Sequence, residues 1–276
     1  MFQRVYIEIT NTCNLDCAFC LKNKRSPKMM TLDEFKHILQ EIKDHTQHIY
    51  LHVQGEPFMH PNLLDFLKCA HEANLKVHLV TNGTYLARVD EALYEHPALV
   101  QLSISLHALQ INDLDQNHLV LKQLIKDSEK HHFSLFLRIW RFDDLASRSK
   151  LSELIDVSID QLPMKRSKIA PNLFIDLDDT FTWPSLNNTF ISEQGYCHSG
   201  TKLIAILVDG TVTPCCLDAE GIIDLGNIHQ VSFESIINGR RLTTLNRSFN
   251  QNICSEKLCK HCTYRLRFNK KRGITL

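Results

Sequence analysis

The feature that most constrains this chain is a group of three cysteines within eight residues: Cys13, Cys17 and Cys20. Thiolates this close in sequence share a small object, and a zinc ion or an iron–sulfur cluster is the usual one. The next cysteine is Cys69, so no fourth thiolate lies nearby. Three ligands on a [4Fe–4S] cube leave one iron open to a substrate or cofactor. A zinc site completed by a distant histidine, and structural thiols, remain alternatives.

Composition sets the other limits. The 276 residues are 43% apolar, enough to bury the core of one large α/β domain, with or without an appendage. Lys+Arg and Asp+Glu both number 31, so we expect neither nucleic acid nor a membrane surface as a partner. A basic run of six Lys and Arg residues between 260 and 272 is expected to be a solvated terminus. Lys22, Lys24 and Arg25, after the first cysteines, are also expected to be a solvated charge run.

The chain shows no targeting or membrane signal. Its first residues lead straight into a strand, and no apolar run of about 18 residues is present. Ten cysteines without a secretion signal favour metal binding in a reducing compartment over disulfides. The sequence therefore predicts a cytoplasmic protein.

Strand and helix patterns alternate along the first two thirds of the chain. This alternation predicts a parallel sheet covered by helices, with function at the carboxyl ends of the strands. Six β/α units are too few for an eightfold barrel, so we expect a partial (β/α)6 TIM-like barrel over residues 1–180. The expected strands are 5–10, 48–54, 76–80, 99–106, 133–140 and 173–177, and the expected helices are 32–42, 62–73, 86–96, 113–131 and 149–157. Thr31 and Glu34 are expected to form a capping box at the start of the first helix, and Leu119 is expected to be buried in the fourth.

Polar residues follow several of these strands. Gly55-Glu56-Pro57 ends the second, where Glu56 can accept hydrogen bonds from an ammonium group and Gly55 permits close backbone approach. Thr81-Asn82-Gly83 closes the third strand. These residues are candidates for cofactor binding, and the alternative interpretation is a capped turn with a left-handed glycine. Ser105 lies near the end of the fourth. Arg138, inside the apolar fifth strand, needs an anionic partner, and a structural salt bridge is an equal alternative.

The first cysteine group resembles the C-x3-C-x-aromatic-C signature of the radical S-adenosylmethionine (SAM) enzymes, with Phe19 at the aromatic position. The resemblance implies that the open iron chelates SAM and that the reduced cluster cleaves it to a 5′-deoxyadenosyl radical. Gly55-Glu56-Pro57 resembles the family's GGEP motif, with Gln54 replacing its first glycine. By this resemblance the SAM-binding residues are Phe19, Gly55, Glu56, Pro57, Asn82, Ser105 and Arg138.

A second set of cysteines lies after residue 181. Cys197 and Cys215 flank a predicted β-hairpin over 204–213 with an Asp-Gly turn. A predicted helix near 233–245 follows, and then Cys259 and Cys262 form a C-x2-C pair. These four thiolates predict a metal cage, with a four-cysteine zinc site as the alternative.

The spacing of this second set resembles the SPASM/twitch extension of radical SAM enzymes, in its shorter twitch form. The resemblance implies an auxiliary [4Fe–4S] cluster held by Cys197, Cys215, Cys259 and Cys262, with either Cys216 or Cys254 able to replace one ligand. We therefore expect residues 181–276 to form a small β-hairpin/helix domain that binds this cluster.

The combined resemblance implies an oxidoreductase-type radical SAM enzyme that abstracts hydrogen from its substrate, with peptide modification as the leading hypothesis. Because the cysteines begin at residue 13, we expect no recognition domain before the barrel, which counts against a peptide. Alternatives are a sugar- or cyclitol-type dehydrogenase and a metal-stabilised binding protein without catalysis. A flavodoxin or ferredoxin is the expected reductant. No catalytic acid or base is predicted; Glu8 and His107 are candidate pocket residues.

Overall fold

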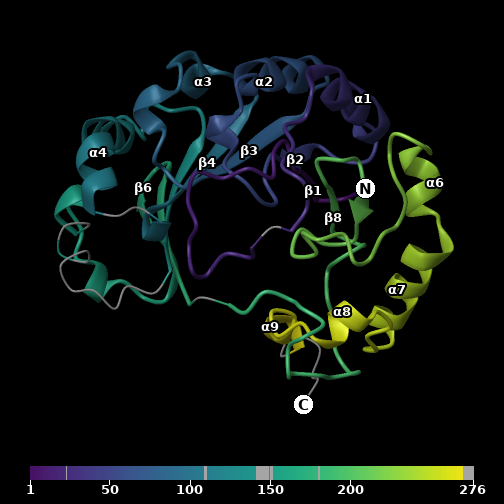
Figure 1. The fold of residues 1–276 in the computed structure, drawn as a ribbon. Coiled ribbons are helices and arrows are strands. Elements are labelled where there is room, and N and C mark those ends of the chain that lie inside the picture. Colours follow the sequence, from purple (N-terminus) through teal and green to yellow (C-terminus); the bar gives the residue numbers. More distant parts are fainter. Residues whose placement is uncertain (23, 109–110, 141–148, 150–151, 180, 270–276) are drawn as a thin grey trace. The chain divides into compact units, whose positions relative to one another are not determined.

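The computed structural model describes the whole chain except residues 23, 109–110, 141–148, 150–151, 180 and 270–276 (Figure 1). Packing divides the chain into two compact units. The first comprises Met1–Gly55, Ala73–Leu75 and Phe181–Leu276, and the second comprises Glu56–Glu72 and Lys76–Thr180. The first unit thus joins both ends of the chain.

The sheet of the first unit combines strands from both ends of the sequence. The strands are β1 (Arg4–Ile7), β2 (His48–Tyr50), β8 (Leu203–Ile206) and β9 (Val212–Thr213). β1 pairs in parallel with β2 and β8, and β8 pairs antiparallel with β9. Figure 1 shows β8, in green, beside the purple β1. The predicted C-terminal hairpin is confirmed, and Gly210 at its turn has a φ of 88°.

Helices of the first unit begin with α1 (Leu32–Ile42). Its predicted capping box is confirmed, because Thr31 accepts from the Glu34 backbone and Glu34 accepts from the Thr31 backbone. The single helix predicted over 233–245 is wrong, because the chain leaves helical geometry at Gly239, whose ψ is 151°. The C-terminal helices are α6 (Phe233–Ile237), α7 (Arg240–Asn250), α8 (Lys257–Lys260) and α9 (Leu266–Asn269).

The second unit carries the strands β3 (Lys76–Thr81), β4 (Leu99–Ser105), β5 (Ser134–Trp140), β6 (Lys165–Ala170) and β7 (Leu173–Asp178). Neighbouring strands in the order β3-β4-β5-β7 are parallel, and β6 pairs antiparallel with β7. The helices are α2 (Leu63–Glu72), α3 (Ala92–Glu95) and α4 (Ile111–Lys126), and the 3-10 turns are η1 (Pro57–Met59), η2 (Leu86–Arg88), η3 (Leu106–Ala108) and η4 (Ile159–Gln161). This parallel-dominated α/β arrangement confirms the predicted fold class.

Several expected elements differ in the structure. The helix expected over 86–96 is η2 and α3, separated by extended backbone at Val89, whose ψ is 140°. α4 ends at Lys126 rather than 131, and Leu119, expected to be buried, is 79% exposed. β6 was not predicted, because its sequence is polar. The helix expected over 149–157 lies partly outside the described residues.

None of the helices in the described ranges is both long enough and apolar enough to span a lipid bilayer.

Candidate cluster and cofactor sites

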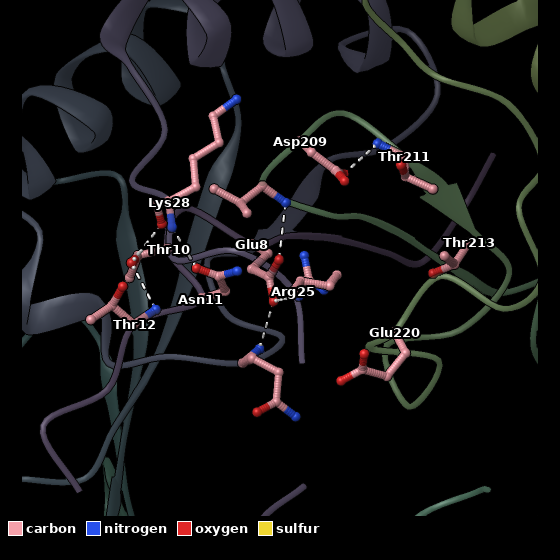
Figure 2. A network of polar contacts seen from close by, with 12 residues as sticks. Glu8, Thr10, Asn11, Thr12, Arg25, Lys28, Asp209, Thr211, Thr213 and Glu220 are labelled. Atoms are coloured by element: carbon pink, nitrogen blue, oxygen red, sulfur yellow. Dashed lines mark hydrogen bonds and ion pairs between the residues drawn. The ribbon is translucent and has the colours of Figure 1, made fainter. Parts of the chain in front are cut away.

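The cysteine loop leaves the end of β1 and returns alongside it. The Thr10 hydroxyl donates to the Lys28 carbonyl at 3.1 Å, and the Lys28 N–H donates to Asn11 Oδ1 at 2.7 Å. The Met30 N–H then donates to the Ile9 carbonyl at 2.8 Å. Figure 2 shows Thr10, Asn11 and Lys28 together at this point. These bonds close the loop at its base, so the cysteines lie on a segment fixed at both ends.

A buried carboxylate ties the loop to two other segments. Glu8 is fully buried and accepts from Arg25 Nη2 at 2.6 Å, from the Gln54 N–H at 3.2 Å and from the Val208 N–H at 3.0 Å. Figure 2 shows Glu8 beside Arg25. Burial raises the pKa of the Glu8 carboxyl, while Arg25 opposes that rise. The expectation that Arg25 belongs to a solvated charge run is wrong, because its guanidinium pairs with this buried acid.

The three cysteines of the loop remain accessible. Cys13 and Cys20 are exposed, and Cys17 is half-buried. Burial raises the pKa of the Cys17 and Cys20 thiols, and the nearby Cys13 thiol raises both further. The three thiols lie within eight residues on a loop that is closed at its base. The loop therefore fits a cluster with three protein ligands and one accessible face.

The segment after β2 contacts this loop through Gln54 and Gly55, because β2 ends at Tyr50 rather than at the expected residue 54. Gly55 has a φ of 75°, and a Cβ there would lie 2.4 Å from the Thr10 carbonyl oxygen and 2.8 Å from that of Thr12. Only glycine fits this conformation and this approach. The Cys20 thiol donates to Gln54 Oε1 across 3.8 Å. The close approach expected at Gly55 thus includes the backbone just before Cys13.

Phe19 adds a contact that the sequence did not predict. Its carbonyl accepts a hydrogen bond of 3.0 Å from the indole N–H of Trp183. Trp183 lies far along the sequence but in the same compact unit. The backbone of the aromatic residue in the cysteine motif is therefore fixed by the C-terminal part of the chain.

Glu56, in the second unit, is fully buried and receives three hydrogen bonds. Its donors are the Phe58 N–H at 2.9 Å, the Thr81 hydroxyl at 2.7 Å and the Asn82 N–H at 2.7 Å. Burial raises the pKa of the Glu56 carboxyl to about 7. Glu56 thereby connects η1, which begins at Pro57, with the turn after β3; its contact with SAM stays a prediction. Gly83 in this turn has the expected positive φ, 83°.

Ser105 and Arg138 are cross-strand neighbours on β4 and β5, and Arg138 is the neighbour of Asp176 on β7. The Arg138 guanidinium carbon lies 4.8 Å from the centre of the Trp140 ring. Asp176 forms a two-point ion pair with Arg166 of β6, at 2.8 and 3.0 Å. The strand ends of the second unit therefore combine a hydroxyl, two guanidinium groups and a carboxylate.

His107 completes this group. Its ring stacks on Trp140 with centroids 4.5 Å apart, and its Nδ1 lies 3.2 Å from the Arg138 carbonyl oxygen. Burial lowers the pKa of His107 to about 4, so the imidazole is neutral at physiological pH. Asn82 is buried, and its Oδ1 accepts from the Thr84 N–H at 3.0 Å.

The second set of cysteines surrounds one pocket in the first unit. The pocket is partly open, so the space of about 350 Å³ between its lining atoms includes solvent. Burial raises the pKa of the Cys197 and Cys262 thiols to about 11 and raises that of Cys259 well above its ordinary value, with neighbouring cysteines adding to each rise. The residues that line the pocket include Cys197, Cys215, Cys259, Cys262, Asp218 and Arg265. All four predicted ligands are therefore brought together by the fold.

The two spare cysteines differ from these four. Cys216 lies beside Tyr6 and Arg4, and Cys254 is 1% exposed; neither lines the pocket. The backbone at Tyr264 and Arg265 opposes the rise in the pKa of the Cys262 thiol. In the described part of the chain, no three His, Cys, Asp or Glu side chains are close enough to share a single metal ion. The thiols stand around a pocket, and a cluster occupies more space than one ion.

Family comparisons agree with this arrangement. Residues 7–138 match the model of the radical SAM superfamily, and residues 197–263 match an iron–sulfur cluster-binding domain, SPASM. The chain is a radical SAM protein with a SPASM-type C-terminal domain. These two domains imply a [4Fe–4S] cluster that binds SAM, an auxiliary cluster and SAM itself. The predicted family and cofactors are thereby confirmed.

Curated relatives span several named activities. An AdoMet-dependent heme synthase from Methanosarcina barkeri is 34% identical over 29% of this chain, and a PqqA peptide cyclase from Bradyrhizobium diazoefficiens is 29% identical over 38% of it. The subtilosin biosynthesis protein AlbA from Bacillus subtilis is 24% identical over 84% of this chain. The matches cover 24%, 29% and 58% of those proteins' own lengths.

Solved structures share the fold. BtrN, in complex with AdoMet and 2-DOIA, has a TM-score of 0.65 at 17% identity, covering 95% of this chain and 93% of BtrN. Streptococcus suis SuiB, bound to the precursor peptide SuiA, has a TM-score of 0.62 at 17% identity, covering 95% of this chain and 71% of SuiB. These radical SAM structures are partial TIM barrels, as predicted here.

Proposed function

We propose that this chain is a radical SAM enzyme that modifies a peptide. The observation that carries the proposal is the accessible three-thiol loop, closed at its base and anchored by the buried Glu8–Arg25 pair. Cys13, Cys17 and Cys20 would hold the first cluster. That cluster, when reduced, supplies cleavage of SAM to a radical that takes hydrogen from the substrate.

The chain's own groups would bind and orient SAM. Gly55 lets its segment pack directly against the backbone just before Cys13, and Arg138 offers a guanidinium that can bind a carboxylate. Ser105, its cross-strand neighbour, can accept from or donate to a ribose hydroxyl. Glu56 would act mainly through the turns it connects, because three donors already occupy its carboxylate. The remaining assigned contacts are Phe19, Pro57 and Asn82.

A peptide substrate is supported by three relatives. AlbA, whose name refers to biosynthesis of a bacteriocin, aligns with most of this chain. PqqA peptide cyclase is a second relative, and SuiB is seen with a precursor peptide. The second candidate is a small-molecule dehydrogenase, which the nearly complete overlap with BtrN and its small ligand favours.

The reductant in this proposal is a one-electron carrier such as flavodoxin or ferredoxin. The cytoplasm suits ten free cysteines, because it keeps thiols reduced. Cys197, Cys215, Cys259 and Cys262 would hold the auxiliary cluster in their shared pocket. A one-electron acceptor there can take the electron left on an oxidised product.

The test is release of 5′-deoxyadenosine by anaerobically reconstituted, dithionite-reduced protein supplied with SAM. Peptide-sized and small-molecule fractions of a cell lysate are added separately, and Cys17→Ala serves as the control. We expect release that depends on Cys17 and rises with the peptide fraction. Stimulation by the small-molecule fraction alone would favour the dehydrogenase.

Two results would contradict the proposed function. If wild-type and Cys17→Ala proteins release no 5′-deoxyadenosine despite full iron loading, the proposed enzyme activity is wrong. Zinc rather than iron in protein purified anaerobically would indicate a metal-stabilised binding protein.

A further inference from the structure

Arg265 is a buried cation in the wall of the second cysteine pocket. Its side chain is 1% exposed, and it lines the pocket with Cys197, Cys215, Cys259 and Cys262. A buried charge is strongly disfavoured unless hydrogen bonds and an opposite charge compensate it. The surroundings of this guanidinium therefore indicate what the pocket is built to hold.

Hydrogen bonds fix the guanidinium in place. Its Nε donates to the Cys259 carbonyl at 2.9 Å, its Nη1 to the Gln194 carbonyl at 2.6 Å and its Nη2 to the Ser192 carbonyl at 2.8 Å. The adjacent residue, Gly195, leaves space for it, since a Cβ there would lie 1.8 Å from Nη1. Three neutral acceptors orient Arg265 but do not neutralise its charge.

No carboxylate of the described residues is paired with Arg265. Among the ion pairs formed by described residues, none includes Arg265. Asp218 lines the same pocket, but its carboxylate accepts from the N–H groups of Ile222 and Ile223, at 2.9 and 2.7 Å. The guanidinium carbon also lies 5.7 Å from the centre of the Phe190 ring, which carries no charge. Among the ionisable groups that line the pocket, the thiols are left to balance Arg265, and they become anionic when they bind a metal centre.

We propose that Arg265 is the counter-cation of the auxiliary iron–sulfur cluster and raises its reduction potential. The inference rests on the proposed function only in requiring a cluster in this pocket. A cluster with four thiolate ligands is anionic, and one-electron reduction makes it more so, which a nearby fixed cation favours. Arg265 is thus a positioning and tuning residue, which makes this cluster a better electron acceptor.

The test compares Arg265→Met, which removes the charge, with Arg265→Lys, which keeps it. Arg247→Met is the matched control, because Arg247 is an exposed residue of α7. All are made in full-length protein carrying Cys13, Cys17 and Cys20→Ala, so that only the auxiliary cluster contributes. Iron content and the midpoint potential, from titration followed by electron paramagnetic resonance, are measured.

We expect Arg265→Met to lower the midpoint potential by at least about 59 mV, a tenfold change in the one-electron equilibrium. Arg265→Lys and Arg247→Met should stay near the parent value. Equal potentials for Arg265→Met and the parent would overturn the inference, as would an equal decrease in Arg265→Lys. If Arg265→Met does not fold or load iron, Arg265→Gln, which also removes the charge but keeps polar hydrogen-bond donors, takes its place: a lowered potential supports the role of charge and an unchanged one contradicts it. Parent protein without iron would instead refute the auxiliary cluster.

Discussion

The two cysteine sets use the same side chain to form two different kinds of site, one on an accessible loop and one around a pocket. In the first, three thiols lie on one loop, two of them exposed, and the buried charges sit at the base of the loop, in Glu8 and Arg25. In the second, four thiols from separate segments line one pocket, and the buried charge of Arg265 is in the pocket wall. An open centre must admit a ligand, whereas a closed one only exchanges electrons. The number of thiol ligands and the position of the buried charge therefore distinguish a site that binds a ligand from one that exchanges electrons.

The largest expected effect separates the roles of the sets. Cys17→Ala should lose about half of the bound iron and all release of 5′-deoxyadenosine, because the cluster that binds SAM is lost. Cys259→Ala should lose a similar amount of iron yet still cleave SAM, without forming the modified product. Iron analysis and chromatography of both products check this.

The spare thiols provide the controls for that prediction. Cys216→Ala and Cys254→Ala should keep full iron loading, since neither cysteine lines the pocket. Loss of iron in either variant, with retention in Cys259→Ala, would reverse the ligand assignment.

A smaller effect is expected from the anchor of the open site. Arg25→Met leaves the buried Glu8 carboxylate without its cation, so the free energy of unfolding of the apoprotein should fall by about 3–5 kcal/mol. Urea denaturation followed by circular dichroism measures it. The control is Arg241→Met, which breaks the more exposed pair with Glu256 and should lose about 1 kcal/mol or less. Equal losses of stability in the two variants would show that the buried Arg25–Glu8 pair stabilises the protein no more than an exposed ion pair does.

The smallest effect is expected from substituting glycines that have a positive φ. Gly55→Ala should lower the free energy of unfolding by about 2–3 kcal/mol, because a Cβ would strain the backbone and contact the Thr10 carbonyl. Gly221→Ala carries a similar φ, 72°, but its nearest contact is a flexible Leu207 methyl at 3.3 Å, so about 1–2 kcal/mol is expected. The same urea titration compares them, and a greater loss in Gly221→Ala would contradict this account.

Local sequence patterns predicted much of this architecture. The capping box at Thr31 and the turn at Gly210 depend on neighbouring residues alone, and both are confirmed. Each cysteine set could likewise be recognised from spacing, and the structure brings Cys197 together with its three distant partners. Interactions between residues a few positions apart can therefore be predicted from the local sequence.

The burial of charged residues against partners far away in sequence could not be predicted in the same way. Arg25 lies in a charge run and Arg265 in a basic C-terminal stretch, so both were expected to be solvated, and both expectations are wrong. Their burial depends on acceptors far away in sequence, such as Glu8 for Arg25 and Gln194 for Arg265. β6 escaped prediction for a related reason: pairing with β7 and the ion pair of Arg166 hold a polar strand in place.

The parallel pairing of β1 with β8 has a consequence for synthesis on the ribosome. Glu8 needs the N–H of Val208, and β1 needs β8, before the base of the first cysteine loop is complete. Because a chain emerges from its N-terminus, some two hundred residues must be translated between the first cysteines and the segment that secures them. Iron delivered to Cys13, Cys17 and Cys20 earlier would meet an unfinished loop. The order of the sequence thus favours cluster insertion after translation.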